Sequence, residues 1–299
     1  MGNGCVGGAG GAFSAVLVNT ILRDTPKWLQ VCWLSFLLTT FSFISNGTAS
    51  EKLASIVMDA SSSKVVLSHN SHKRLHPAGL TKLMTLYVAL EAIKNKEISA
   101  DTIVTVSRKA ASEPPSRMGL RTRQKVKFKD LIIGIALMDA NDAATAIAEG
   151  ISGTEGAFAN RMNLMAKSLG MFNTTFKNAC GLTEREHLSS AFDMAILGHR
   201  LILDFPNHYK ILSERVRSTG FGSRIRNSNT RILNSYKEID AVKSGYSRRS
   251  GYNFFATAIK KERSLIVVNF GNRTMKAGIQ EVEKLFDIGF STLGLDPSS

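Results

Sequence analysis

Cysteine is scarce in this sequence. The 299 residues contain three cysteines, and two of them, Cys5 and Cys32, lie within the first 49 residues. Cys180 is alone in the rest of the chain, so no internal disulfide can stabilise residues 50–299. We predict that Cys180 is a small apolar residue of the core.

Acidic residues are also few. There are 24 of them against 38 lysines and arginines, which gives a formal net charge of +14. A positive charge of this size favours an anionic partner. The sequence has no zinc-finger spacing, no basic helix with heptads and no aromatic RNA-binding motif, so it does not predict a nucleic-acid partner. Anionic peptidoglycan and a membrane surface would attract the same charge, and charge alone does not choose between them.

Histidines cluster at His69, His72 and His76. Three histidines so close in sequence suggest a metal site, but their spacing matches no zinc pattern. We predict a solvated loop there, and neither a metal nor an organic cofactor anywhere in the chain.

The first 49 residues have the pattern of a targeting segment. An apolar run at residues 28–45 follows Arg23 and Lys27 and is itself followed by small residues. This order of basic, apolar and small residues is typical of a secretory signal peptide. An uncleaved membrane anchor is the alternative, since the run is of borderline length for spanning a bilayer. We predict a leader at residues 1–49, one folded domain at residues 50–299, and an exported protein of the periplasm or cell envelope whose leader could associate with the membrane.

The folded domain is organised around an apolar helix that begins with a lysine. The stretch from Pro77 to Thr85 leads into an almost wholly apolar sequence that continues to Ile93. A helix with so little polar surface is normally buried in a sizeable domain. Lys82 lies at its start, where desolvation would favour the neutral, basic form of the amine. Taken alone, Lys82 could also be a surface lysine whose stem lies along the protein.

Two further stretches carry polar residues at positions that need an explanation. A second apolar helix, Asp130 to Ala148, is interrupted by the polar turn 139–142. Polar groups that interrupt a buried helix need a partner or a function, although Asn141 could simply break or cap the helix. Residues 239–246 are predicted to form a strand that contains Lys243-Ser244-Gly245. Such a short match could also be an ordinary strand end.

Shorter patterns complete the secondary-structure prediction. A capped helix start is expected near Ser190, where hydroxyl side chains and Asp193 precede an apolar run. The other expected elements are strands at 54–60, 64–68, 251–258 and 265–271, helices at 158–169 and 280–293, and a basic loop at 99–130.

Together these stretches resemble the serine-type D-alanyl-D-alanine carboxypeptidases, the low-molecular-mass penicillin-binding proteins. The first family motif is Ser-x-x-Lys, and here Lys82 is present while Gly79 takes the place of the serine. The second motif, Ser-x-Asn, appears as Asp139-Ala140-Asn141, and the third, Lys-Thr-Gly, as Lys243-Ser244-Gly245. The resemblance runs from about residue 54 to residue 293.

The resemblance implies an α+β fold of the penicillin-binding-protein/β-lactamase-like transpeptidase type. Such a fold has an antiparallel sheet with a helix packed on each side. We expect an all-helical lobe inserted between the second and third motifs, with the site between the lobe and the sheet.

The resemblance assigns catalytic roles to positions of which two have changed. Lys82 corresponds to the base, and Asn141 to the residue that holds the substrate amide. Gly79 has no side chain, so no acyl-enzyme can form there, and losing the nucleophile of a catalytic unit can cost about 10⁶ in rate. Thr81 lies roughly 200° around the helix from Gly79 and should point elsewhere. Asp139 puts a carboxylate in place of a neutral hydroxyl, and an ion pair with Lys82 would keep that lysine protonated and useless as a base.

The resemblance also implies the substrate-binding residues. Lys243 and Ser244 would hold the terminal carboxylate of the substrate, and Gly245 would let the substrate lie against the strand. The backbone N–H groups of Gly79 and Tyr246 would form the oxyanion hole.

The sequence therefore predicts a D-alanyl-D-alanine carboxypeptidase-family protein of peptidoglycan metabolism that is catalytically degenerate. It would retain a cleft for stem peptides ending in D-Ala-D-Ala, and it would bind β-lactams non-covalently at most. The alternative is an active serine-type carboxypeptidase that removes the terminal D-alanine with a non-standard nucleophile or a water molecule. A β-lactamase is a third alternative, but it would need the same missing serine.

Overall fold

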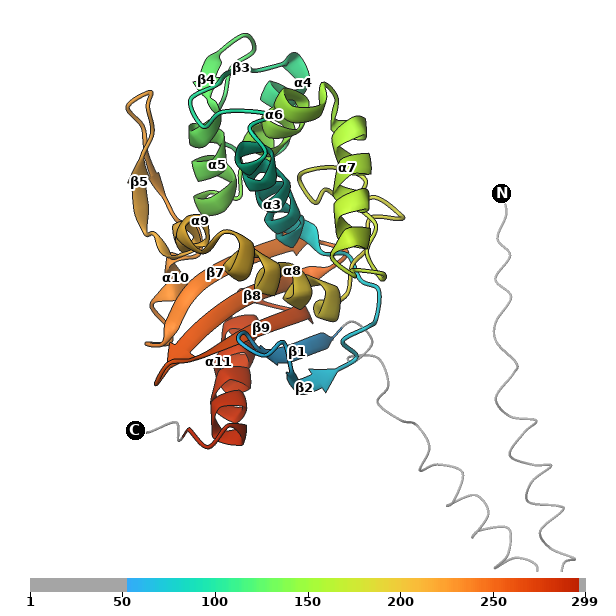
Figure 1. The fold of residues 1–299 in the computed structure, drawn as a ribbon, viewed down its shortest axis with the longest axis vertical. Helices are drawn as coiled ribbons and strands as arrows, with labels where there is room; N and C mark the ends of the chain where they lie inside the picture. The colour runs from blue at the N-terminus through green and yellow to red at the C-terminus, as the bar shows by residue number, and fades with distance from the viewer. Residues whose placement is uncertain (1–52, 296–299) are drawn as a thin grey trace, which may run out of the picture. The chain divides into compact units, whose positions relative to one another are not determined.

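The computed structural model describes residues 53–295, so the leader predicted at residues 1–49 lies outside the described part. A five-stranded antiparallel sheet forms the base of the fold, in the order β2-β1-β9-β8-β7 (Figure 1). Strand β7 is therefore an edge strand. The five strands are β1 (Ala54–Asp59), β2 (Val65–His69), β7 (Ile239–Ser247), β8 (Gly251–Lys260) and β9 (Arg263–Asn272).

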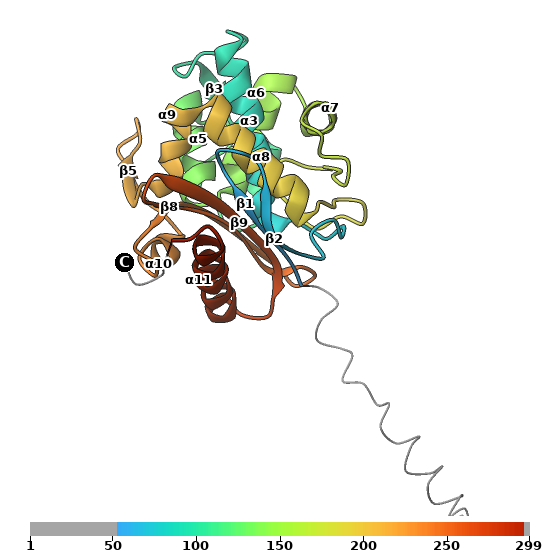
Figure 2. The same ribbon diagram turned by 60° about the horizontal axis from the view of Figure 1, so that its bottom comes forward.

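A helix packs on each face of this sheet. They are α8 (Ala191–Asp204) and α11 (Met275–Thr292), and Figure 2 shows them on opposite sides of the strands. Phe254 and Phe255 of β8 are both fully buried and point to opposite faces, as consecutive strand residues must. A Cβ on Gly278 of α11 would lie 2.0 Å from the Phe254 ring, and one on Gly198 of α8 would lie 2.0 Å from the Phe255 ring. Glycine at both positions thus lets both helices approach the sheet closely.

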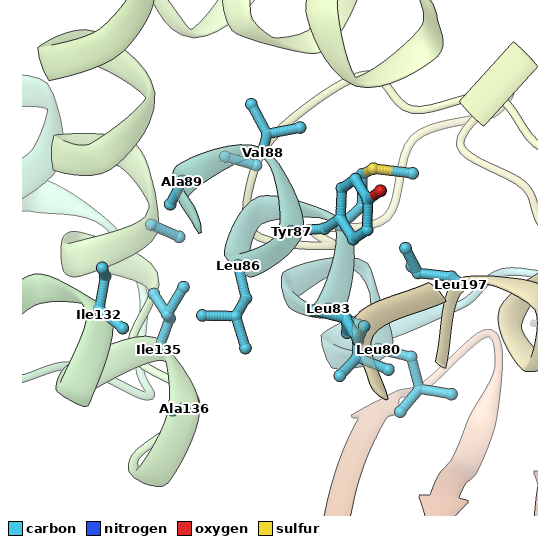
Figure 3. Packing of buried hydrophobic residues seen from close by; sticks show 14 of the residues in the cluster. Leu80, Leu83, Leu86, Tyr87, Val88, Ala89, Ile132, Ile135, Ala136 and Leu197 are labelled. Atoms are coloured by element: carbon cyan, nitrogen blue, oxygen red, sulfur yellow. The ribbon is translucent and has the colours of Figure 1, made fainter. Parts of the chain in front are cut away.

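A helical lobe covers the α8 side of the molecule, with helix α3 at its centre. The helices of the lobe are α3 (Thr81–Lys94), α4 (Arg108–Ser112), α5 (Phe128–Leu137), α6 (Asn141–Ser152) and α7 (Glu155–Ser168). Figure 3 shows Leu86 of α3 facing Ile135 of α5, while Leu83 faces Leu197 of α8. Since α3 is covered on several sides, its nearly continuous apolar sequence is explained by burial.

The lobe differs from the expected one in two respects. It begins directly after β2, so it contains the first and second motifs instead of lying between the second and third. It is also not wholly helical, because residues 99–130, predicted as a loop, contain α4 and a small hairpin of β3 (Ile103–Thr105) and β4 (Lys125–Lys127). Strands of three residues are too short to give a clear alternating pattern, and only Val126 of β4 is buried.

Hydroxyl side chains cap the starts of two helices, and one of these starts differs from the predicted position. Thr274 accepts a hydrogen bond from Ala277 N–H, so α11 begins at Met275 instead of residue 280. Ser190 caps α8 through Asp193 N–H, which confirms the predicted helix start.

The segment between α8 and β7 had no sequence prediction. It consists of α9 (Pro206–Tyr209), η3 (Lys210–Ser213), β5 (Val216–Ser218), β6 (Arg224–Arg226) and α10 (Thr230–Leu233). The β5–β6 hairpin stands beside the lobe in Figure 1. Within residues 53–295, no helix has both the length and the apolar character that crossing a bilayer requires.

Candidate active site

The turn before α3 rests directly on the edge strand of the sheet. This turn is η2 (Ala78–Leu80). A Cβ built on Gly245 would lie 2.3 Å from Gly79 N, and a Cβ built on Gly79 would lie 3.0 Å from Gly245 Cα. Only glycine permits two backbones to approach this closely. The first and third motifs, far apart in sequence, are therefore in direct contact.

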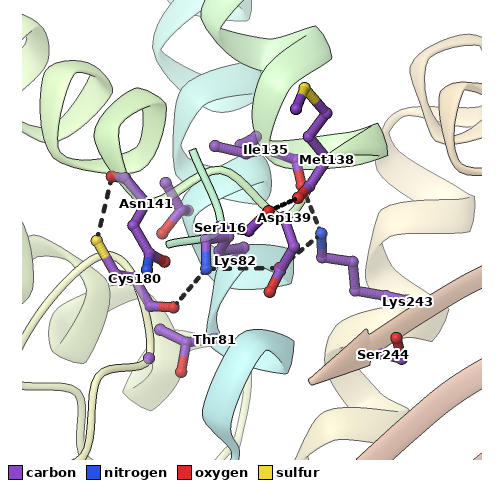
Figure 4. A network of polar contacts seen from close by, with 12 residues as sticks. Thr81, Lys82, Ser116, Ile135, Met138, Asp139, Asn141, Cys180, Lys243 and Ser244 are labelled. Atoms are coloured by element: carbon purple, nitrogen blue, oxygen red, sulfur yellow. Dashed lines mark hydrogen bonds and ion pairs between the residues drawn. The ribbon is translucent and has the colours of Figure 1, made fainter. Parts of the chain in front are cut away.

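Lys82 is buried, as its place in the sequence predicted. It is the second residue of α3 and is 2% exposed. Its Nζ donates a hydrogen bond of 2.7 Å to the carbonyl oxygen of Cys180 and lies 3.4 Å from Asp139 Oδ1 (Figure 4). The surface-lysine alternative is thus wrong.

Asp139 lies between two lysines. It occupies the turn between α5 and α6 with a φ of +57°, a left-handed conformation that Asp tolerates better than most residues. The predicted ion pair with Lys82 is present, and a shorter one, of 2.9 Å from Oδ1 to Lys243 Nζ, was not predicted. Both contacts of Oδ1 are ion pairs and not aligned hydrogen bonds. Lys243 also donates a hydrogen bond of 2.5 Å to the carbonyl oxygen of Ile135.

Burial and charge act in opposite directions on Lys243. Its side chain is 1% exposed, and this burial lowers the pKa of its amine. The Asp139 carboxylate raises that pKa again, while the nearby Lys82 ammonium lowers it. Two amines share one carboxylate, so the site carries a surplus of positive charge whenever both amines are protonated.

The Asp139 carboxylate also fills the space beside Gly79. A Cβ built on Gly79 would lie 2.5 Å from Asp139 Oδ2 and 3.0 Å from Oδ1. A side chain at position 79 and the present position of this carboxylate therefore exclude each other.

Asn141 holds the loop that precedes α5 against the start of α6. Its Nδ2 donates to the carbonyl oxygens of Pro114, at 2.9 Å, and Pro115, at 3.3 Å. Its backbone N–H donates to Ser116 O, and Ser116 Oγ in turn donates to Met138 O at 2.8 Å. Asn141 is the first residue of α6, and its side chain holds this loop instead of capping the helix, because the N-cap is Ala140 with no side-chain hydrogen bond.

Thr81 points away from Gly79, as predicted. Its Oγ1 lies 2.8 Å from His187 Nε2. Because Lys177 N–H donates to His187 Nδ1, the ring proton sits on Nε2 and is donated to Thr81. Burial, with smaller contributions from the charges of His76, Lys82 and Lys177, lowers the pKa of His187 to about 4.

The predicted substrate-binding residues continue along β7. Ser244 donates a hydrogen bond of 2.5 Å to Asn229 Oδ1, and Gly245 pairs with Asn253 of β8. Tyr246 is 56% exposed, and its ring centre lies 4.4 Å from that of Tyr252. Sequence reasoning missed Asn229, which lies in an irregular segment with no motif.

The three clustered histidines do not converge. His69 contacts Asn70, His72 packs against Phe192, and His76 donates from Nδ1 to the carbonyl oxygen of His187.

Sequence reasoning also missed a buried polar cluster beside Lys82. Glu113, Glu155 and Cys180 have the spacing of a metal-ligand set in the described part of the chain. However, the Thr145 hydroxyl donates a hydrogen bond to the Glu113 carboxyl group. Glu155 accepts a hydrogen bond from Ala179 N–H and forms an ion pair with Lys109. Burial raises the pKa of Glu113 and, to about 12, that of the Cys180 thiol. Groups that already have hydrogen-bond and ion-pair partners form a structural network and a poor ligand set.

Known proteins resemble this chain in both sequence and structure. Residues 45–274 match the family described as D-alanyl-D-alanine carboxypeptidase. D-alanyl-D-alanine carboxypeptidase DacF of Bacillus subtilis (strain 168) is 36% identical over 254 residues, which cover 83% of this chain and 64% of that protein. DacC of Escherichia coli (strain K12) is 37% identical over 241 residues, which cover 79% of this chain and 60% of that protein. The chain thus spans less than two thirds of the length of these relatives.

Two solved structures share the architecture. Penicillin binding protein 5 from Haemophilus influenzae has a TM-score of 0.75 and 34% identity, covering 80% of this chain and 70% of its own. Penicillin-Binding Protein D2 from Listeria monocytogenes, in its ampicillin-bound form, has a TM-score of 0.73 and 29% identity, covering 79% and 96%. The predicted α+β fold of the penicillin-binding-protein type is confirmed, and the chain belongs to the D-alanyl-D-alanine carboxypeptidase family.

Proposed function

We propose that this protein is a degenerate D-alanyl-D-alanine carboxypeptidase that binds peptidoglycan stem peptides without hydrolysing them efficiently. The observation that carries the proposal is the pairing of Gly79 with Asp139. The family's nucleophile would stand at position 79, where there is no side chain, and a carboxylate fills the adjacent space.

Neither the hydroxyl of Thr81 nor the thiol of Cys180 is placed to replace the nucleophile. The Thr81 hydroxyl is bonded to His187, and the Cys180 thiol is buried with its pKa raised to about 12, so neither offers a reactive anion at neutral pH. Lys82 would serve as the base of an active enzyme, but here it is paired with Asp139. Its Nζ is also engaged as a donor to Cys180 O, so a base would first have to leave both partners.

The strand side of the site keeps what a peptide ligand needs. Lys243 and Ser244 would offer an amine and a hydroxyl to a terminal carboxylate by exchanging their contacts with Asp139 and Asn229 for the ligand. Gly245 adds no side chain of its own over the strand backbone. Because β7 is an edge strand, an extended peptide can add to it by main-chain hydrogen bonds. Asn141 and the N–H groups of Gly79 and Tyr246 would contact the ligand amide and carbonyl.

The names of the relatives support the choice of ligand. They are D-alanyl-D-alanine carboxypeptidases and penicillin-binding proteins, one of them solved with ampicillin bound. The ligand of this chain would be a stem peptide ending in D-Ala-D-Ala, and β-lactams would bind non-covalently at most. An exported protein of the periplasm or cell envelope would meet that ligand, in agreement with the apolar segment at residues 28–45.

Covalent labelling tests the loss of catalysis. Purified protein is incubated with a fluorescent penicillin, and D-alanine release from a pentapeptide is followed in parallel. We expect no labelled band after denaturing electrophoresis and no D-alanine above the uncatalysed background. A stable penicillin adduct on any side chain would show that a nucleophile exists and would refute the proposal. Calorimetry with acetyl-Gln-D-Ala-D-Ala tests the cleft, and absence of binding would refute that part.

An active enzyme is the second candidate, and one observation favours it. Asp139 Oδ2 lies 2.5 Å from where the Cβ of residue 79 would be, close to the attacking group of a serine enzyme. The Asp139 carboxylate would take a proton from water as the water oxygen bonds to the terminal peptide carbonyl carbon, and it would return that proton to the nitrogen as the C–N bond breaks and D-alanine leaves as the amine. Release of D-alanine that disappears in Asp139→Asn, with no penicillin adduct at any stage, would establish this mechanism.

A further inference from the structure

A pocket lies between the helical lobe and the tip of the β5–β6 hairpin, which stands beside the lobe in Figure 1. It has a volume of about 510 Å³. One wall is the loop at residues 118–124 of the lobe, and the other is the hairpin tip with Phe221 and Ser223. No part of the proposed function uses this pocket.

Two buried aspartates hold the two walls in place. Asp142 is fully buried, and its carboxylate accepts hydrogen bonds of 2.9, 2.9 and 3.0 Å from the backbone N–H groups of residues 118–120. Asp130 is also buried and accepts a hydrogen bond of 3.0 Å from the N–H group of Gly220, next to Phe221. Since the two carboxylates belong to α5 and α6 of the lobe, the pocket is a preorganised part of the fold.

The lining of the pocket contains arginines and no acid. Arg121 and Arg123 line it, and in the described part of the chain neither forms an ion pair with a carboxylate. The surplus of positive charge extends around the pocket. Residues 114–127 and 214–233 contain five basic residues each, against a single acid, Glu214, which pairs with Arg217. Arginines without acidic partners favour a carboxylate or phosphate, which a guanidinium group can hold by two hydrogen bonds.

The other lining residues are suited to a sugar ring. Phe221 stands between two glycines at the hairpin tip and is 40% exposed, so its ring is open to a ligand. An aromatic ring offers an apolar surface to the C–H groups of a sugar, and Thr122 and Ser223 offer hydroxyl groups to the sugar hydroxyls. A wholly apolar ligand would leave the arginines without partners, and a small inorganic anion would not use the ring.

We propose that this pocket binds a sugar that carries a free carboxylate, with the sugar ring against Phe221 and the carboxylate at Arg121 and Arg123. The family of this chain acts in peptidoglycan metabolism. The ligand is therefore the muramic acid of a glycan strand, at a position where its carboxyl group carries no stem peptide. The inference goes beyond the proposed function and does not rest on it, because the pocket lies outside the cleft at Lys243.

Two disaccharides that differ in one charge test the proposal. N-acetylglucosaminyl-N-acetylmuramic acid and its carboxamide are titrated with the full chain in 0.15 M NaCl, and each Kd is measured by ligand-observed NMR. We expect the acid to bind about fivefold more tightly than the carboxamide, in the range of a partly exposed charge pair. Equal Kd values, or no binding of the acid, would overturn the proposal.

Variants on the two walls locate the binding. Arg121→Gln should remove the preference for the acid, and Phe221→Ala should weaken both disaccharides about fivefold. Arg273→Gln and Phe172→Ala are the matched controls, since they make the same changes at exposed residues that do not line the pocket. Both controls should leave both Kd values unchanged. Equal losses in the variants and their controls would mean that the sugar binds elsewhere, which overturns the proposal.

A third disaccharide tests the source of the sugar. The repeating unit of hyaluronan carries its carboxylate on glucuronate and has no lactyl group. It should bind more weakly than the muramic acid disaccharide, and equal or tighter binding would overturn the assignment to peptidoglycan. Melting temperatures of all variants within 2 °C of the parent protein would show that lost binding does not come from unfolding. Calorimetry with acetyl-Gln-D-Ala-D-Ala reports on the proposed function separately, so its failure would leave this inference standing.

Discussion

In the resemblance described above, the two sides of the site depart from the family motifs by different amounts. The strand side, with Lys243, Ser244 and Gly245, departs from Lys-Thr-Gly only by the exchange of one hydroxyl residue for another. The helix side carries Gly79 and Asp139 where the family pattern has two serines. The resemblance assigns ligand binding to the strand side and the chemistry to the helix side, and the proposed function keeps the first and loses the second. Ligand binding and catalysis therefore depend on separate elements of the fold, so that one function can be lost while the other is kept.

Asp139 joins the two sides by charge. Two buried lysines facing each other without a counter-charge would be strongly unfavourable, since each would be both desolvated and repelled. Asp139 lies within 3.4 Å of Lys82 and 2.9 Å of Lys243, so it compensates both. A carboxylate at this position is thus coherent with glycine at position 79, because a side chain there would displace it.

The largest expected effect comes from restoring the helix side. Gly79→Ser together with Asp139→Ser supplies a nucleophile and removes the carboxylate that blocks it. We expect penicillin labelling to rise at least about 10³-fold over the parent protein, within the range that a nucleophile contributes. Labelling is measured by fluorescence after electrophoresis and mapped by mass spectrometry.

Gly79→Ser alone is the matched control for this restoration. Its Cβ would lie 2.5 Å from Asp139 Oδ2 and 3.0 Å from Gly245 Cα, so it should be less stable and remain unlabelled. A folded double variant that stays unlabelled would mean that the strand side has drifted from the family geometry as well.

A smaller effect is expected from removing the charge that joins the two sides. Asp139→Asn leaves Lys82 and Lys243 without their counter-ion, and we expect a loss of about 2 kcal/mol in the free energy of unfolding at pH 7. Burial already holds the pKa of Lys243 in the folded protein below that of a free lysine. At pH values between the folded and the unfolded pKa, the unfolded chain binds more protons than the folded one, so stability rises with pH there. Without Asp139 the folded pKa falls further, and the deficit of the variant should shrink toward pH 10. Urea unfolding at both pH values measures this.

Asp101 provides the comparison for that variant. It also pairs with two lysines, Lys127 at 3.1 Å and Lys129 at 2.8 Å, but all three side chains are largely exposed. Asp101→Asn should leave stability unchanged because water screens exposed pairs. Equal losses in Asp101→Asn and Asp139→Asn would contradict the view that burial makes the Asp139 contacts important.

The smallest expected effect is a loss of folding stability at acid pH, caused by a histidine on the helix side of the site. His187 anchors Thr81 on the helix side, and burial lowers its pKa to about 4, below the unfolded value of about 6.5. The unfolded chain therefore takes up a proton first as pH falls, and stability is lost between pH 6.5 and pH 4. We expect about 1 kcal/mol of this loss between pH 7 and pH 5.5. It should be absent in His187→Gln and retained in His69→Gln, which changes an exposed histidine. Identical slopes in all three proteins would refute the assignment.

The fold and half of the site could be predicted from the sequence, for identifiable reasons. The apolar sequence after Lys82 requires burial, and the continuous apolar runs in β8 and β9 favour a sheet covered on both faces. The ion pair between Asp139 and Lys82 followed from motif positions. The pair with Lys243 did not, because it depends on the distance between two motifs that meet only in the folded chain.

Other features left no readable pattern in the sequence. The acceptors of Lys82 and Lys243 include backbone carbonyl oxygens at Cys180 and Ile135, and any residue type provides one. Asn229, which accepts from Ser244, lies in an irregular segment that no periodicity describes.

The order of strands in the sheet determines how early in synthesis the sheet can form. Strand β1 lies between β2 and β9, and its partner positions in β9, such as Val268 opposite Ile56, are roughly 200 residues later in the chain. Within residues 53–295, the first strand thus waits for the last one, β9, before the sheet can close. If the protein is exported as proposed, late closure of the sheet would keep the chain unfolded while it is moved across the membrane.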